Sequence, residues 1–140
     1  MVTFQLNSTN KKQDSIYLPL FDKICNEITK TLKIKGKKIF EVNFITSSKI
    51  KTLNNKYRHI NKATDVLSFP LNHNELIGEI FIATDFAKKE AKLHNWTMKY
   101  EICLLFTHGL LHLLGWDHDT KTKENKMFAL QDKIVANVIN

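Results

Sequence analysis

Four short segments of the chain place hydrophobic residues as β-strands do. In residues 2–6 and 40–44 they alternate with polar residues, the period of a strand that buries one face. Residues 65–69 and 77–83 are short apolar runs bounded by turn-forming residues, also typical of strands. We expect Pro70 to end the third strand and Asn72-His73-Asn74 to form a tight connection to the fourth.

Five longer segments carry apolar residues at helical spacing. They cover residues 18–34, 47–57, 84–94, 97–114 and 120–138. Their first residues follow good capping residues: Thr46, Ser47 or Ser48 for the second, Thr97 for the fourth, and Asp119 or Thr120 for the last. The polar stretch from Asn7 to Ser15 predicts a loop.

The order of these segments predicts an α+β fold. A chain of 140 residues is long enough for a single domain with a substantial core, which we expect to span residues 1–140. Within it, about five helices would cover a small four-stranded mixed sheet.

Composition narrows the class of protein. Hydrophobic residues make up 43% and charged residues 25%, which is ordinary for a soluble globular chain. No apolar run approaches the roughly 18 residues needed to cross a bilayer, so no membrane association is expected. The N-terminus lacks the basic and apolar regions of a secretory signal. The two cysteines, Cys25 and Cys103, lie inside predicted helices, so a reducing cytoplasm is the expected location.

The charge balance points to a polyanionic partner. The formal net charge is +7, which suits RNA, although a lysine-rich, asparagine-rich chain can also reflect biased coding. Nearly every cation is lysine, and Arg58 is the single arginine. A guanidinium retained in such a chain suggests a use for its planar fork of donors, which lysine cannot supply.

Three of the six histidines fall within eleven residues, at His108, His112 and His118. Residues four apart stand on the same face of a helix, so the first two imidazoles can reach one ion. Gly115 lies where glycine commonly ends a helix, and a turn there could bring His118 back. Three protein ligands with a fourth position open are typical of catalytic zinc.

The alternative is that these histidines are ordinary hydrogen-bonded core residues. The surrounding run is strongly apolar, and an unpaired buried polar group costs roughly 1–3 kcal/mol. Three such costs so close together favour the metal site. Nickel or copper would also accept three imidazoles, so the identity of the metal stays open.

The spacing of the three histidines, with glycine at i+7, resembles that of the metzincin zinc peptidases. Those enzymes carry a glutamate directly after the first histidine as the general base, whereas this chain has Gly109. The motif therefore predicts a zincin-like scaffold without peptidase chemistry.

The full stretch His-Gly-Leu-Leu-His-Leu-Leu-Gly-Trp-Asp-His resembles the signature of the YbeY family of metal-dependent endoribonucleases. Other blocks extend the resemblance over roughly residues 50–135: Tyr57-Arg58, Thr64–Pro70, Gly78–Ile82 and Met127–Gln131. The chain departs from the family at Trp116, where tyrosine is usual, and at Glu79, where aspartate is frequent. Residues 59–63 also lack the family's glycine, aspartate and proline.

The resemblance implies a zinc-dependent, single-strand-specific endoribonuclease of ribosomal RNA maturation at the small-subunit 3′ end, and of ribosome quality control. It implies one Zn²⁺ on His108, His112 and His118, with Arg58 and His112 as catalytic residues. Its implied partners are ribosomal RNA, the small ribosomal subunit and an assembly GTPase. Zinc-bound water or the ribose 2′-hydroxyl could be the nucleophile, and only RNA allows the second route.

Several further residues are candidates for supporting roles. Asp65, Glu79, Glu101 and Asp117 could each orient a ligand histidine, or else cap a turn or face solvent. The lysines around Arg58 (Lys49, Lys51, Lys56 and Lys62) could track phosphates or simply be solvated. His59, His73 and His94 fit no ligand spacing and are expected at the surface. Two rival functions remain: a zincin-like peptidase with a base from elsewhere, and a non-catalytic assembly factor with a structural metal.

Overall fold

A mixed four-stranded sheet forms the centre of the molecule, a computed structural model that describes residues 1–8 and 10–139. The strands are β1 (Val2–Asn7), β2 (Lys38–Ile45), β3 (Val66–His73) and β4 (Leu76–Ala83), in the spatial order β1-β2-β4-β3. The β1–β2 and β2–β4 pairs are parallel, and the β3–β4 pair is an antiparallel hairpin. The predicted α+β class with a small mixed sheet is confirmed.

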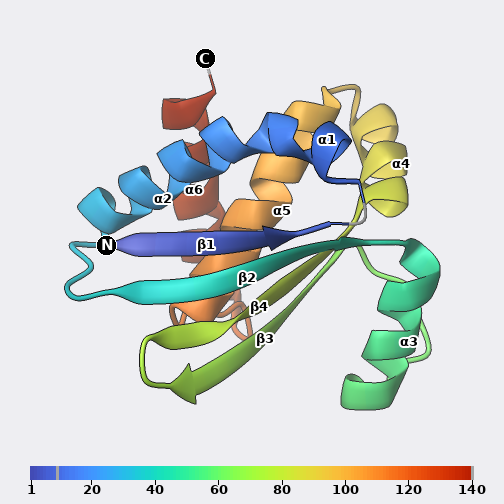
Figure 1. Ribbon diagram of the computed structural model, residues 1–140, viewed down its shortest axis with the longest axis horizontal. Helices are drawn as coiled ribbons and strands as arrows, with labels where there is room; N and C mark the ends of the chain where they lie inside the picture. Colours follow the sequence, from blue (N-terminus) through green and yellow to red (C-terminus); the bar gives the residue numbers. More distant parts are fainter. Residues whose placement is uncertain (9, 140) are drawn as a thin grey trace.

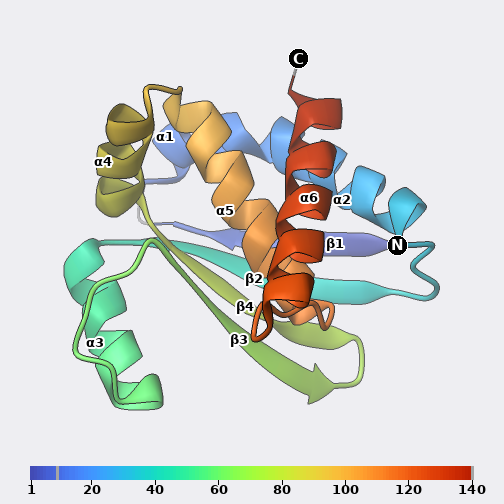
Figure 2. The same cartoon turned by 180° about the vertical axis from the view of Figure 1, so that it is seen from behind.

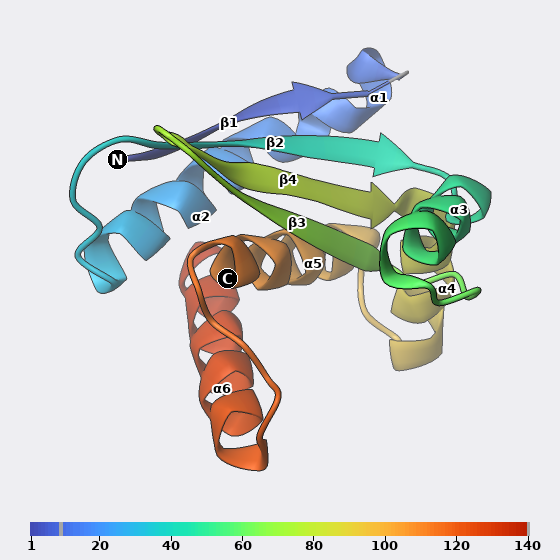
Figure 3. The same cartoon turned by 90° about the horizontal axis from the view of Figure 1, so that it is seen from below.

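The helices gather mainly on one face of this sheet, as Figures 1 and 2 show. They are α2 (Leu18–Thr31), α3 (Ser47–Arg58), α4 (Thr84–His94), α5 (Met98–Leu113) and α6 (Lys121–Val138), preceded by a single turn, α1 (Lys11–Asp14). Helix α5 packs against β3 and β4 and contacts both α4 and α6, while α3 stands apart at one end of the sheet (Figure 3).

The main core fills the space between α2, α5, α6 and the covered face of the sheet. The rings of Phe21 on α2 and Phe106 on α5 stack at a centroid distance of 3.8 Å, and Phe4 and Phe40 contact Phe106 from the sheet. A smaller apolar cluster under α3 includes Ile50, Leu67 and Ala83. These two clusters hold α5 and α3, which carry the predicted site residues, at fixed places on the sheet.

Three predicted helix caps are observed. The side chains of Thr46, Thr97 and Thr120 accept hydrogen bonds from the backbone N–H groups of Lys49, Tyr100 and Lys123 at 3.1–3.2 Å. Such bonds satisfy N–H groups that have no partner inside the first turn. Each threonine therefore sets the first residue of its helix, as the sequence pattern predicts.

The prediction of a loop from Asn7 to Ser15 is wrong for part of that stretch. Residues Lys11–Asp14 form α1, and Ser15–Tyr17 continue as a 3₁₀ helix; Thr9 lies outside the described residues. The Asn10 side chain accepts from the Gln13 N–H and begins this turn. A single turn held by polar caps has no apolar period, so the hydrophobic pattern could not reveal it.

The end predicted for the third strand at Pro70 is also wrong, because β3 continues to His73. Strand β3 lies at the edge of the sheet and pairs only with β4. Proline lacks a backbone N–H, which costs nothing where that group would face away from a partner strand. The connection consequently falls later, at Asn74 and Glu75, with Asn74 in the left-handed region at φ 57°.

Among the described residues, the structure contains no helix that combines the length and the apolar character required to span a membrane.

Candidate metal centre

Helix α5 and the turn after it bring three histidines together. His108 and His112 lie one turn apart near the C-terminal end of α5. Leu114 ends the helix, and Gly115 follows with φ 100°, a backbone conformation that side chains disfavour. The Trp116 N–H then bonds the Leu111 carbonyl at 2.9 Å, which closes the turn. The chain reverses here and returns His118 over the helix, as the glycine position predicts.

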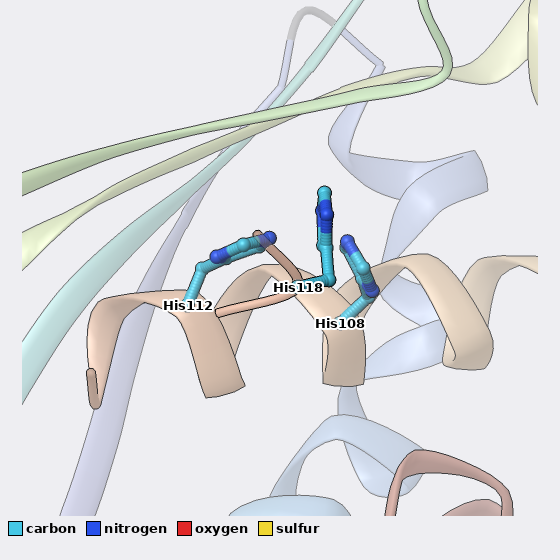
Figure 4. Close-up of side chains that lie close together, drawn as sticks. All are labelled: His108, His112 and His118. Atoms are coloured by element: carbon cyan, nitrogen blue, oxygen red, sulfur yellow. The ribbon is translucent and has the colours of Figure 1, made fainter. Parts of the chain in front are cut away.

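The three imidazole rings converge on one point. A ring nitrogen from each of His108, His112 and His118 lies within 4.8 Å of those of the other two. The ring centroids are 4.8 Å apart for His108 and His112, 5.0 Å for His112 and His118, and 5.6 Å for His108 and His118. Figure 4 shows the rings from α5 and from the following turn pointing toward one another.

Burial favours the neutral form of His108 and His112. The pKa of His108 is lowered to about 4, chiefly by desolvation; the hydrogen bond with Gln131 opposes this shift, and the neighbouring His112 and His118 contribute to it. Burial, followed by the proximity of His118, also lowers the pKa of His112. A neutral imidazole has a free nitrogen lone pair, which is the form that binds a metal ion.

Gln131 of α6 holds the ring of His108. Its side-chain oxygen lies 2.9 Å from His108 Nδ1, and Gln131 is 7% exposed. Because a carbonyl oxygen can only accept, Nδ1 carries the proton and Nε2 keeps the lone pair for a metal. From the sequence, Gln131 appears only at the end of the segment Met127–Gln131 that resembles the family, and no role is predicted for it. The signal available in the sequence was a glutamine on the apolar face of the predicted last helix, where a polar side chain needs a hydrogen-bond partner.

Gly109 allows α5 to lie close against the sheet. A side-chain Cβ at this position would come within 2.8 Å of Ile80 Cγ2 and 3.1 Å of Ser68 Oγ. The Ser68 hydroxyl donates to the Gly109 carbonyl at 3.2 Å, which fixes the contact. Residue 109 therefore faces β3 and β4. The side chain of a glutamate, which zinc peptidases carry at this position, would not fit here.

A cavity of about 490 Å³ opens in front of the histidines. Arg58, the last residue of α3, lines this cavity together with His108, His112 and His118. The opposite wall comes from the first half of β3 and the residues before it, including Asp65 and Ser68. Residues that are far apart in the sequence thus line one cavity, which we name the arginine cavity.

Asn54 fastens the loop that follows Arg58. It is 3% exposed, and its side-chain amide donates to the Lys62 carbonyl at 2.9 Å. His59 ends α3 in the left-handed region at φ 58°. This buried amide inside a polar helix had no distinctive sequence pattern, so its role emerges only from the structure.

The four candidate carboxylates occupy different places. Asp65 and Asp117 line the arginine cavity, and the Asp117 carboxylate accepts from the His118 backbone N–H at 2.7 Å. Glu101 is buried, but its partner is the indole N–H of Trp96 at 2.9 Å. Glu79 lies on the other face of the sheet beside Glu41, because its neighbours Gly78 and Ile80 contact α5. The side chain that bonds the His108 ring is instead Gln131 of α6.

The donor set fits a divalent transition metal. Three neutral imidazoles suit zinc, copper or nickel, whereas magnesium and calcium prefer oxygen ligands. The hydrogen bond from His108 Nδ1 to Gln131 is the kind of support that orients a metal ligand. His59, His73 and His94 are exposed and take no part in this cluster, as expected.

Comparison with known proteins gives a consistent assignment. The family model described as "Endoribonuclease YbeY" matches residues 4–139. A protein of that name from Ureaplasma urealyticum is 40% identical over 126 residues, covering 87% of this chain and 81% of the relative. One from Acholeplasma laidlawii is 43% identical over 104 residues, covering 73% of this chain and 76% of the relative.

A solved structure shares the fold. The solution structure of TM1509 from Thermotoga maritima aligns with a TM-score of 0.71 at 29% identity. The alignment covers 99% of this chain and 89% of the Thermotoga protein. The similarity therefore extends over both the sheet and the helices that carry the histidine cluster.

Proposed function

The chain belongs to the YbeY family of endoribonucleases, and from this premise we propose that it is a zinc-dependent enzyme that cleaves single-stranded ribosomal RNA. We place its action in the cytoplasm, at the 3′ end of the small-subunit RNA and in ribosome quality control, with the small subunit and an assembly GTPase as partners. The observation that carries the proposal is one cavity lined by three convergent histidines and the only arginine.

His108, His112 and His118 would hold the zinc ion. Zinc, when bound, lowers the pKa of a coordinated water toward about 7 and so supplies a nucleophile or proton acceptor at neutral pH. The protein's part is to favour the neutral form of His108 and His112 through burial and to orient His108 through Gln131.

Arg58 would bind the phosphate that is cleaved. A phosphodiester under attack gathers negative charge on its non-bridging oxygens, and a guanidinium can donate two parallel hydrogen bonds to them. Arg58 reaches the arginine cavity from the end of α3, opposite the histidines. Lys51, Lys56 and Lys62 are exposed on and just after α3, where they would attract the RNA backbone.

The test incubates the zinc-loaded protein with three substrates and measures cleavage of each. They are a single-stranded RNA with the small-subunit 3′ sequence, the same RNA as a duplex, and an unstructured peptide. We expect cleavage of the single strand alone. Arg58→Ala should lower kcat about 10²–10³-fold, as loss of a charge-stabilising donor does, while zinc content stays at one per chain. His112→Ala should lose both zinc and cleavage. Lys133→Ala removes an exposed cation of α6, away from the cavity, and should cleave normally.

The same measurements separate the rival functions. A peptidase would cleave the peptide, and Gly109 with its tight packing already removes the usual general base. A non-catalytic assembly factor would cleave nothing, and its Arg58→Ala variant would support ribosome assembly as the native chain does. RNA cleavage that persists in both Arg58→Ala and His112→Ala would identify a contaminating nuclease and overturn the proposal.

A further inference from the structure

A second cavity lies behind the histidine cluster, on the side away from Arg58. Its volume is about 370 Å³, within the usual range for small-molecule sites. It shares Asp65, Val66, His108 and His118 with the arginine cavity, so the two spaces meet at the proposed metal centre. A molecule bound at the histidines can therefore extend one of its groups into this second cavity.

Aromatic rings form part of its walls. The Phe128 ring is nearly parallel to the rings of His108 and His118, at 19° and 8°, with centroid distances of 5.8 and 6.4 Å. Trp96 lines the opposite side, with His94 stacked on it at 4.5 Å. Flat apolar faces of this kind stack well with a nucleobase.

Three carboxyl groups line the cavity as hydrogen-bond acceptors. Glu101 is 4% exposed; Trp96 donates to its Oε2, and Oε1 has no hydrogen-bond partner among the described residues. Asp65 and Glu90 add two more carboxyl groups, and neither lysine nor arginine is among the lining residues of the described chain. Burial raises the pKa of both Glu101 and Asp65, so these desolvated carboxylates gain from a hydrogen-bond donor that replaces lost water. A phosphate would be repelled, whereas a neutral group with N–H donors would be favoured.

We propose that this second cavity, the base pocket, binds the nucleobase next to the cleaved phosphate and that Glu101 selects bases with an exocyclic amino group over uracil. The inference rests on the proposed function, since it assigns the RNA phosphate to the arginine cavity. Unpaired RNA bases are commonly recognised by stacking on aromatic rings and by hydrogen bonds to their edges. An ionised carboxylate only accepts, so it pairs with the N4 amino group of cytosine and opposes the O4 carbonyl of uracil.

Cytidine and uridine provide a size-matched test that needs no cleavage. The chain has two tryptophans, and Trp116→Phe leaves Trp96, which lines the base pocket, as the only tryptophan, whose fluorescence can be excited selectively. Titrating this zinc-loaded protein with each nucleoside should quench Trp96 fluorescence. We expect cytidine to bind about tenfold more tightly than uridine, the ratio for one charge-assisted hydrogen bond.

Glu101→Gln in the same background tests the selecting residue. Glutamine can still accept from Trp96 and adds an N–H₂ donor, so the preference for cytidine should fall at least threefold, with uridine gaining affinity. Glu124→Gln makes the same change on the exposed part of α6 and should keep the native ratio. Near-UV circular dichroism and zinc content check that each variant is folded.

The outcomes separate this inference from the proposed function. Equal quenching by cytidine and uridine, no saturable quenching, or an unchanged ratio in folded Glu101→Gln would overturn the base pocket, even where RNA is cleaved. Selective cytidine binding in a protein that cleaves no RNA would support the pocket and overturn the endoribonuclease proposal.

Discussion

A proton and a metal ion would compete for the same ring nitrogens of His108 and His112 in the candidate metal centre. His108 and His112 lie in an environment that disfavours their charged forms, chiefly because they are buried and close to other imidazoles. Gln131 supplies the hydrogen bond that selects the tautomer of His108. These features have consequences for stability at low pH and for metal affinity.

In the metal-free protein, stability should fall as the pH drops below about 6.5. The pKa of His108 is lowered from 6.5 to about 4, so between these values the unfolded chain binds a proton that the folded chain does not. This contribution is complete above pH 6.5 and amounts to about 3.5 kcal/mol at most, since each pKa unit is worth about 1.4 kcal/mol. Urea denaturation with a chelator between pH 7.5 and 4 measures it.

Two variants isolate this contribution from that of the carboxylates. His108→Asn removes the buried ring, so its stability should depend less steeply on pH than that of the native chain. His73→Asn removes an exposed histidine of the β3–β4 hairpin and should keep the native dependence. Parallel curves for the native chain and His108→Asn would contradict the prediction.

Loss of the Gln131 acceptor should weaken metal binding. Gln131→Leu keeps the size of the side chain but leaves His108 Nδ1 without its partner, and we expect zinc affinity to drop about 10–100-fold, as is typical for removal of such an orienting bond. Gln131→Glu keeps an acceptor and should bind zinc at least as well as the native chain. Competition with a chromophoric chelator gives the affinities.

Gln5→Leu is the matched control for this prediction. Gln5 is exposed on β1, far in the fold from the cluster, so its replacement should leave zinc affinity unchanged. If Gln131→Leu binds zinc as tightly as Gln5→Leu does, then Gln131 does not support the metal ligand.

At the scale of elements, the site depends on how closely α5 approaches the sheet. Gly109 on the helix lies against Ile80 of β4, and Gly78 of β4 lies against Leu113 of the helix. These two contacts set the height of α5, and with it the positions of His108 and His112 over β3. Packing thus explains the glycine at position 109.

Gly109→Ala should destabilise the protein although alanine favours helices. The added methyl would lie 2.8 Å from Ile80 Cγ2, and overpacking of this kind costs about 1–3 kcal/mol, against a gain in helix propensity of about 1 kcal/mol. Relieving the clash should reverse the sign, so Gly109→Ala should be neutral or stabilising in an Ile80→Ala background. Urea denaturation of the four proteins forms a double-mutant cycle. Simple additivity of the two changes would show that the two side chains do not meet.

At the scale of the whole molecule, the core and the metal centre are separate. The buried cluster of phenylalanine, isoleucine and leucine side chains between α2, α5, α6 and the sheet is continuous without any metal ligand. The histidines lie at its border, on the walls of the two cavities. A metal ion bound by the histidines would consequently not be needed to hold the elements together.

Removal of the metal should therefore lower the melting temperature without unfolding the chain. Zinc that binds only the folded state stabilises it by mass action, about 4 kcal/mol at a free concentration a thousand times Kd. After chelation, far-UV circular dichroism should keep its native shape at 25 °C, and His112→Ala should melt near the temperature of the chelated native protein. A chain that unfolds on chelation would instead have a structural metal, as the assembly-factor alternative requires.

Local sequence determined much of this protein. Helix caps at Thr46, Thr97 and Thr120, the turn at Gly115 and the pairing of His108 with His112 depend on residues a few positions apart, and all could be predicted. The hydrophobic periods likewise predicted the four strands and the five main helices. The one-turn helix α1 and the length of β3 could not be predicted, because polar caps and an edge position leave no mark on the apolar pattern.

Only the tertiary structure decided which distant residues meet at the site. The bond from Gln131 to His108 requires α6 to cross α5, and the orientation of Glu79 away from the metal depends on the packing of α5 against one face of β4. The base pocket requires residues from β3, α4, α5 and α6 together. Such contacts follow from strand register and helix docking, which depend on the burial of the whole core and not on the spacing of neighbours along the chain.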